Sequence, residues 1–294
     1  MSPAPSHVLP HALKLPIFKY LKDKRVVLAS SSPRRKEVLE GLKPDIVPST
    51  FPENLPHGSY SNAYAEYPIA TAMEVYERLI LKDEENAPEL VISADTVIIF
   101  PPQTNADAII NNPSTISQSS NARLTGLNTD ITSAEESEDL GEGERNGEGS
   151  RDELSWSGRR GGIARILEKP ADKKDQALTY PVRQYKMLME LNGETCEVVT
   201  GVTIVYPTIA APGFKLRSIA VSTLVEFNNN SPELIKAYVE NGEGIDRAGG
   251  FAVQGLGGFL VKSIQGDYNN VVGFPSSPFW RWMGELYEDG VFSD

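Results

Sequence analysis

Short apolar runs alternate with helix-forming stretches along this chain of 294 residues. The runs 25–29 and 90–100 are typical of buried strands, and residues 33–42 after the first run predict a helix. Two long β-branched runs, 197–206 and 217–227, are joined by a loop rich in Pro and Gly and predict paired strands. This alternation of strands and helices indicates a mixed α/β fold.

Capping residues mark further helices in the second half of the chain. Residues 185–191 predict a helix that ends at Gly193. Ser231 followed by Pro232 and an acid is typical of a helix start, and Gly242 predicts its end. These signals place helices around the predicted strand pair.

Residues 101–162 interrupt this pattern with Asn, Ser, Thr, Gly and Glu. Segment 128–153 holds ten acidic residues and only two basic ones, a net charge of −8 against −12 for the whole chain. Such a composition buries too little apolar surface to offset the entropy of ordering. We therefore expect one folded domain over 24–290, a disordered acidic insertion within it, and a loose Pro-rich leader over 1–23.

The composition narrows the function classes. The negative net charge argues against a generally basic nucleic-acid-binding surface, and no run of about 18 apolar residues predicts a membrane span. One cysteine and no secretory signal pattern are typical of a cytoplasmic protein. The chain has only three histidines, which argues against a Ser-His-Asp triad or a His-rich zinc site. Any catalysis would use carboxylates, Lys, Arg and a metal ion.

The first candidate site is the serine-rich turn between residues 25–29 and the following helix. Ser32 is the natural N-cap there, and Arg34, Arg35 and Lys36 occupy the first turn. Cations at this end oppose the helix dipole by a few tenths to about 1 kcal/mol each. Free backbone amides and cations together predict an anion site. The alternative is a solvated helix start whose basic residues face water.

The second candidate is Asp95, a carboxylate inside the apolar run 90–100. A buried carboxylate costs several kcal/mol unless a cation or metal compensates. Ligands of open α/β sheets sit at strand ends, which makes Asp95 a candidate general base or metal ligand. The alternative is an aspartate that caps a turn at a strand end.

The third candidate is the glycine-rich block 246–258, which leads into 261–273. Closely spaced glycines let the backbone approach a ligand or turn tightly. The spacing differs from the dinucleotide-binding fingerprint, which disfavours that fold. Gln254 could read a base edge or a ribose. The alternative is a set of structural turns between strands.

These motifs together resemble the Maf-like nucleotide pyrophosphatases over about 24–100 and 163–290. Ala94-Asp95-Thr96 and Asp246–Gly249 are similar to the branch that acts on dTTP and UTP. The matching motifs, in order, are Ser30–Leu39, Ala94–Val97, Lys169-Pro170, Thr200–Val202 and Asp246–Gly273. The resemblance implies an elongated, twisted mixed sheet with helices on both sides and two lobes around a central cleft, as in inosine triphosphatases.

The resemblance also implies a function. The chain would be a house-cleaning hydrolase that cleaves the α–β phosphate bond of dTTP, UTP or related modified nucleotides, giving the monophosphate and pyrophosphate. It would use Mg²⁺ or Mn²⁺ and often form a homodimer. The implied roles are base for Asp95, metal ligand for Glu53 and Asp95, triphosphate binding for Ser30, Arg34 and Arg35, charge neutralisation for Lys169, and nucleotide contact for Gln254.

Three departures from the family pattern keep other functions open. Val75 stands near the place of a family lysine, and Arg78 is the nearest cation. Cys196 stands where the family often has His, and we interpret it as a small buried residue. The insertion falls between Asp95 and Lys169. The alternatives are a nucleotide-binding regulator without turnover and an interaction protein whose acidic insertion is the working part.

Overall fold

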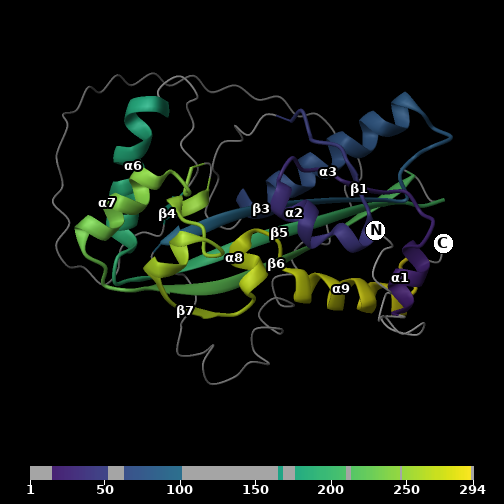
Figure 1. Ribbon diagram of the computed structural model, residues 1–294. Coiled ribbons are helices and arrows are strands. Elements are labelled where there is room, and N and C mark those ends of the chain that lie inside the picture. The colour runs from purple at the N-terminus through teal and green to yellow at the C-terminus, as the bar shows by residue number, and fades with distance from the viewer. Residues whose placement is uncertain are drawn as a thin grey trace, which may run out of the picture.

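A mixed seven-stranded sheet forms the centre of the protein in the computed structural model (Figure 1). The structure describes residues 15–51, 63–100, 165–167, 176–209, 213–245 and 247–292. Six strands follow one another in the order β2-β1-β3-β5-β6-β7, and β4 also pairs with β3. The strands are β1 (Val26–Leu28), β2 (Asp45–Ile46), β3 (Leu90–Phe100), β4 (Arg165–Leu167), β5 (Thr195–Pro207), β6 (Phe214–Phe227) and β7 (Val261–Gln265).

Strand directions show why the sheet is mixed. β1 runs parallel to both β2 and β3, whereas the β3–β4, β3–β5, β5–β6 and β6–β7 pairs are antiparallel. The paired strands predicted over 197–206 and 217–227 are β5 and β6, which form the longest antiparallel pair. The predicted mixed α/β fold with an open, elongated sheet is therefore confirmed.

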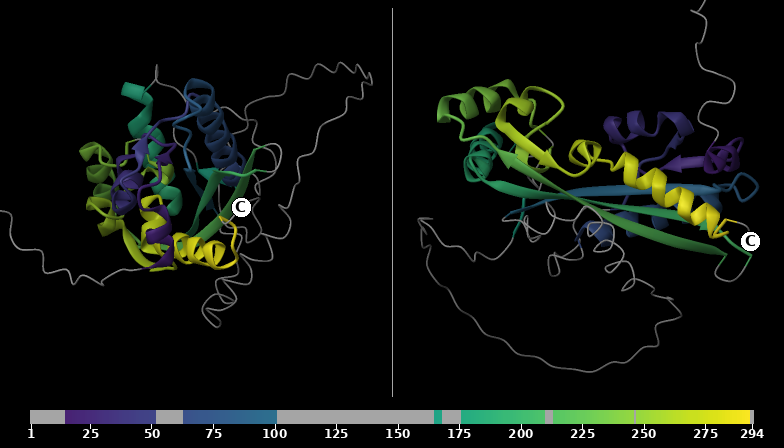
Figure 2. Two further views of the ribbon diagram at one scale, coloured as in Figure 1. Left: turned by 90° about the vertical axis from the view of Figure 1, so that its right-hand side faces the viewer. Right: turned by 90° about the horizontal axis from the view of Figure 1, so that it is seen from below.

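Helices cover both faces of the sheet, and Figure 2 shows several of them on one side of it. They are α1 (Pro16–Leu21), α2 (Pro33–Val38), α3 (Ala63–Lys82), α6 (Gln176–Leu191), α7 (Pro232–Asn241), α8 (Tyr268–Val272) and α9 (Ser276–Glu288), with 3₁₀ turns η1 (Glu40–Leu42), η2 (Ala248–Gly250) and η3 (Leu256–Leu260). Among the described helices, none is both long and apolar enough to cross a bilayer.

One face of the sheet carries two separate hydrophobic clusters, which form the two lobes. In the first, α1 and α9 pack on Ile92 and Ile204 of β3 and β5. In the second, α6 and α7 pack on Ile98 and Val198 of the same strands. Figure 1 shows α6 and α7 at one end of the sheet and α1 and α9 at the other, with α8 between them.

The other face is covered by α3 over part of its length. Ala72, Val75, Tyr76 and Leu79 of this helix pack on a third cluster that includes Val91 of β3. Because side chains alternate along a strand, odd-numbered residues of β3 face α3 and even-numbered residues face α8 and the two lobes.

The two ends of α7 follow the capping signals of the sequence. Ser231 accepts a hydrogen bond from the backbone of Leu234 as the N-cap of α7, and Gly242 ends the helix with a φ of 80°.

The loose leader expected over 1–23 differs from the structure at its C-terminal end. Residues 16–21 form α1, whose Ile17 and Leu21 are buried against the first cluster.

Candidate functional site

The candidate site lies where one edge of β3 has no neighbouring strand among the described residues. β5 occupies one edge of β3, so β1 and β4 share the other. β1 pairs only as far as Ile92, and β4 pairs from Ile98 onward. The edge of residues 93–97 between them therefore pairs with no described strand. Asp95 is the middle residue of this open edge.

Asp95 and Thr96 lie side by side on the open edge, and their side chains point to opposite faces of the sheet. Ser93, on the same face as Asp95, donates to the carbonyl of Pro68 on α3. Asp95 is half-buried and pairs across the sheet with Gly201, well inside β3. The alternative of a carboxylate that caps a turn at a strand end is therefore wrong for Asp95.

On the face of the sheet to which Thr96 points, Arg35 is held by hydrogen bonds to three groups from three parts of the chain. Its Nε donates to the carbonyl of Gly273 at 3.0 Å. Its terminal nitrogens donate to the hydroxyls of Ser30 at 3.3 Å and Thr96 at 3.4 Å. Thr96 in turn shares a 2.9 Å hydrogen bond with Thr200 of β5. The arginine is thus positioned by the chain after β1, by β3 and by the end of α8.

Arg34 lies in a strongly cationic surrounding. Burial, followed by repulsion from Arg247 and Arg35, lowers the pKa of Arg34 to about 10. Its Nε is buried with no hydrogen-bond partner among the described residues. An added Cβ on Gly273 would lie 3.9 Å from this Nε and from the Thr96 hydroxyl, which places Arg34 beside Thr96. The folded chain therefore disfavours the charge of Arg34, and an anion would relieve that cost.

The helix dipole contributes less here than the sequence suggests. α2 spans only six residues and gives way to the 3₁₀ turn η1, so the predicted helix over 33–42 is broken. Ser32 makes no side-chain cap, and its backbone N–H donates to the Ser30 hydroxyl at 3.2 Å. Ser30 therefore shapes the turn and supports Arg35, while Lys36 is exposed. Arginine side chains, more than a helix terminus, make this a polyanion site.

The remaining predicted residues are less closely connected to this cluster. Gln254 lies on an exposed turn between η2 and η3. Glu53 and Lys169 lie outside the described residues. Cys196 is fully buried in the second cluster, and burial raises the pKa of its thiol to about 12, which leaves it unreactive. The structure thus brings together Ser30, Arg34 and Arg35 beside Thr96. Asp95 is the next residue along β3, and its side chain points to the opposite face of the sheet.

Two polar residues of this region were not among the predicted site residues. Thr96 receives a hydrogen bond from Arg35, and Arg247 lies close enough to Arg34 to lower its pKa. Both stand next to residues that the sequence analysis singled out, in Ala94-Asp95-Thr96 and in the block that begins at Asp246. The signal for Arg247 was a cation beside closely spaced glycines, a pattern typical of phosphate sites.

The side of α3 offers no comparable cation among the described residues. Val75, near the place of the family lysine, is fully buried. Arg78 donates to Glu74 at 2.6 Å and to the carbonyl of Pro48 at 2.9 Å. Burial alone would raise the pKa of Glu74, but hydrogen bonds from Arg78, Ser49 and Thr50 outweigh it and lower this pKa to about 2. Arg78 is thus engaged in fastening the 48–50 segment to α3.

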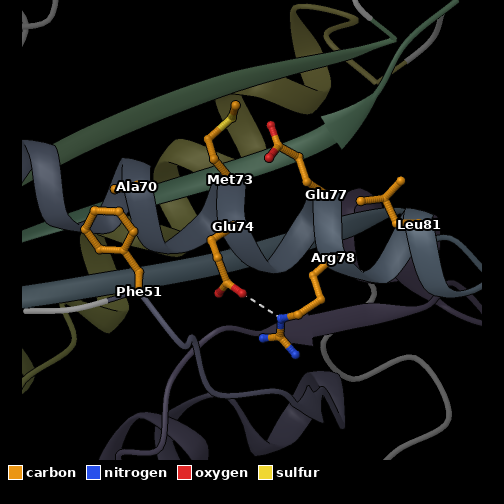
Figure 3. A pocket seen from close by; sticks show the side chains of 7 residues that line it. All are labelled: Phe51, Ala70, Met73, Glu74, Glu77, Arg78 and Leu81. Carbon is orange, nitrogen blue, oxygen red and sulfur yellow. Dashed lines mark hydrogen bonds and ion pairs between the residues drawn. The ribbon is translucent and has the colours of Figure 1, made fainter.

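An open pocket of about 460 Å³ lies along the same helix, beside Phe51 (Figure 3). Glu74 and Glu77 line it together with Arg78, and Figure 3 shows the ion pair between Glu74 and Arg78. With two carboxylates and one neutralised arginine, the pocket repels a triphosphate. The arginine cluster on the opposite face is the better anion site.

A divalent metal fits this site in part. Asp95 supplies one half-buried carboxylate at the open edge. Within the described ranges no three His, Cys, Asp or Glu side chains gather as a full protein cage would need. Mg²⁺ normally takes one or two carboxylates, substrate phosphates and water, so Asp95 suits a metal that is shared with the substrate.

Fold and site define the class: an open α/β sheet with a polyanion site beside a strand carboxylate. The Maf-like protein family model matches residues 25–135 and 159–286, and the chain belongs to this family. It is 30% identical to the dTTP/UTP pyrophosphatase of Schizosaccharomyces pombe over 97% of this chain and 93% of that protein. It is 29% identical to the Saccharomyces cerevisiae dTTP/UTP pyrophosphatase over 88% of both chains.

A human relative is longer. The chain is 34% identical to a Homo sapiens protein named "Probable bifunctional dTTP/UTP pyrophosphatase/methyltransferase protein" over 92% of this chain. The match spans only 34% of that protein's length. The resemblance predicted from the motifs is therefore confirmed by the family model and by these relatives.

Proposed function

We propose that the protein is a nucleoside triphosphate pyrophosphatase that hydrolyses dTTP, UTP or related modified nucleotides to the monophosphate and pyrophosphate. The observation that carries this proposal is the arginine cluster beside Thr96, at the edge of β3 that also holds Asp95. A triphosphate carries about four negative charges, which matches a site where arginine charge is disfavoured without an anion. The names of the yeast relatives support the choice of nucleotide.

Arg34 and Arg35 bind the phosphates in this proposal, and Arg247 adds a third cation from the side of the second lobe. Arg35 is pre-oriented by the Gly273 carbonyl and the Ser30 hydroxyl, so little side-chain entropy is lost on binding. Fixed cations that face the transferring phosphoryl group stabilise the charge that develops on it.

Asp95 activates the attacking water as the general base. Its half-buried position in a strand fixes the carboxylate, and no described strand pairs with the edge on which it lies. Lys169 neutralises phosphate charge and Gln254 contacts the nucleoside; both roles come from the family resemblance. Asp95 and Glu53 would hold Mg²⁺ or Mn²⁺, which when bound screens phosphate charge and lowers the pKa of a coordinated water.

A pyrophosphate-release assay with single nucleotides tests the proposal. The full chain is incubated separately with dTTP, UTP, dCTP, GTP and ATP, each with Mg²⁺ or Mn²⁺. We expect dTTP and UTP to give the highest kcat/KM. Tight nucleotide binding without pyrophosphate release would instead support a regulator, for which the buried Val75 in place of a lysine is the structural argument. An absence of both binding and release would contradict the proposal.

A further inference from the structure

Asn270 of α8 is fully buried between the two hydrophobic lobes. Thr96, Thr200 and Thr223 lie on the same face of the sheet, between the first cluster and the second. A polar seam thus crosses the centre of the face, and α8 lies over it (Figure 1). Buried amides are costly unless their hydrogen bonds are formed, so the partners of Asn270 indicate what it does.

The side-chain amide of Asn270 binds two strands at once. Its Nδ2 lies 3.0 Å from the carbonyl of Val198 on β5 and 3.0 Å from the carbonyl of Val221 on β6. The Thr223 hydroxyl is a third acceptor at 3.0 Å. Both carbonyls can only accept, so the amide nitrogen must face them. Asn270 therefore clamps α8 onto β5 and β6.

The main chain of α8 carries this anchoring to Arg35. The N–H of Gly273 donates to the Asn270 carbonyl at 3.1 Å. The Gly273 carbonyl then accepts the 3.0 Å hydrogen bond from Arg35 Nε. Thr200 reaches the Asn270 carbonyl at 3.5 Å and contacts Thr96, which also binds Arg35. Two short hydrogen-bonded paths therefore connect Asn270 to the same guanidinium.

The cost of keeping this amide argues against a purely structural role. The Oδ1 of Asn270 is buried without a hydrogen-bond partner among the described residues. An unsatisfied buried acceptor lowers stability, and a residue placed only for packing avoids it. The hydrogen bonds of this amide fix the position of the Gly273 carbonyl, which orients Arg35.

We propose that Asn270 is a positioning residue for the reaction: it fixes the end of α8 so that the Gly273 carbonyl holds Arg35 toward the substrate phosphates. This inference rests on the proposed function of Arg35. A misplaced donor lowers affinity and rate because the pre-organised geometry is lost while the charge remains. Asn270 itself does not need to touch the nucleotide.

A double-mutant cycle between Asn270 and Arg35 tests this inference. Asn270→Ala, Arg35→Ala and the double variant are compared with wild type in the full chain. The dissociation constant of the non-hydrolysable analogue α,β-imido-dUTP is measured by calorimetry, together with the unfolding free energy. Asn269→Ala is the matched control, because the N–H groups of Gly273 and Phe274 bond to the backbone carbonyl of Asn269, which this variant keeps.

We expect Asn270→Ala to weaken analogue binding about tenfold in wild type and less than about twofold in the Arg35→Ala background. The Asn269→Ala control should leave binding within about twofold of wild type. Equal losses in both backgrounds would overturn the inference and leave the role of Arg35 intact. Unchanged binding by Arg35→Ala alone would overturn both this inference and the phosphate-binding role of Arg35.

A milder variant covers the case in which Asn270→Ala does not fold. Asp267 is the N-cap of α8, and its carboxylate accepts from the Asn270 N–H at 2.7 Å. Asp267→Ala loosens the same helix and leaves the Asn270 side chain in place. The same cycle with Arg35→Ala should again show a binding loss that disappears when Arg35 is absent. A loss of stability without any binding loss in this variant would overturn the inference.

Discussion

Arg34 and Arg78 lie on opposite faces of one sheet, and their surroundings differ: Arg78 has a carboxylate partner, whereas Arg34 lies near other arginines. Arg78 donates to Glu74 and to a backbone carbonyl and fastens a loop to α3. Arg34 has two further arginines nearby, and burial and their repulsion lower its pKa to about 10. An arginine with a carboxylate partner stabilises the fold, whereas one among cations is ready for an anion. The comparison locates phosphate binding on the side of α2 and α8.

The largest effect is expected at Asp95, on the open edge that both faces share. Asp95→Asn is nearly isosteric and should keep the fold. Loss of the base should lower kcat by about 10² or more, because general-base catalysis contributes that much. Steady-state pyrophosphate release measures this change, with circular dichroism as the control for folding. Turnover within about threefold of wild type would remove Asp95 from the mechanism.

Arg34→Ala and Arg35→Ala should separate binding from stability. Each should weaken nucleotide binding by about 1.5–3 kcal/mol, the range for hydrogen bonds to charged groups. For Arg34→Ala the unfolding free energy should hold or rise slightly, because the folded state disfavours that charge. Calorimetric titration and urea unfolding measure the two quantities. Lost stability with unchanged binding would reverse the assignment.

Arg78→Ala should show the opposite behaviour. We expect a stability loss of about 0.5–1 kcal/mol, because the ion pair with Glu74 is partly exposed, and an unchanged KM. Urea unfolding and steady-state kinetics check both parts. A strong rise in KM would mean that Arg78 replaces the family lysine, which would break the contrast between the two faces.

Glu74→Gln adds a pH dependence on the α3 side. Hydrogen bonds lower the pKa of Glu74 from its ordinary value of 4.5 to about 2 in the folded protein, so its stabilising effect is full above about pH 4.5. This effect is lost as the pH falls toward 2. We expect the variant to be about 1 kcal/mol less stable at pH 7. The difference from wild type, measured by urea unfolding, should disappear at low pH, and a constant difference would contradict the assignment.

The smallest effect is expected from the acidic segment. Replacing residues 105–158 with a short Gly/Ser linker should leave thermal stability about equal, because loop-closure entropy changes only logarithmically with length. Its negative charge lies between Asp95 and Lys169 in the sequence, so its removal should raise the nucleotide on-rate at low salt only. Stopped-flow binding at two ionic strengths measures this. A linker variant that cannot fold would show that the segment is part of the domain.

Much of the fold could be predicted because its strands are continuous apolar runs. Residues 90–100 form β3 over the predicted range, and Ser231 and Gly242 delimit α7 as their types indicate. Helix α9 was missed, although Phe279, Met283 and Leu286 repeat at helical spacing. Local periodicity and capping therefore predicted four of the seven described strands and three of the seven described α-helices. Short segments such as α1 depend on the distant surface that covers them.

The geometry of the site depends on contacts between distant residues. Among the described residues, the edge at Asp95 has no strand partner because β1 stops at Leu28 and β4 ends at Leu167, opposite Ile98. No local sequence pattern records which strands share an edge. The sequence indicated Arg34 and Arg35 by their position in the first turn of a helix. The structure assigns the orientation of Arg35 to Gly273 instead, more than two hundred residues away.

The most direct test of the central claim is the identity of the products from dTTP. The full chain with Mg²⁺ is allowed to consume dTTP, and the products are separated by ion-exchange chromatography. We predict dTMP and pyrophosphate in equal amounts from wild type and neither product at a comparable rate from Asp95→Asn. Formation of dTDP and phosphate, or equal turnover by the two proteins, would contradict the account.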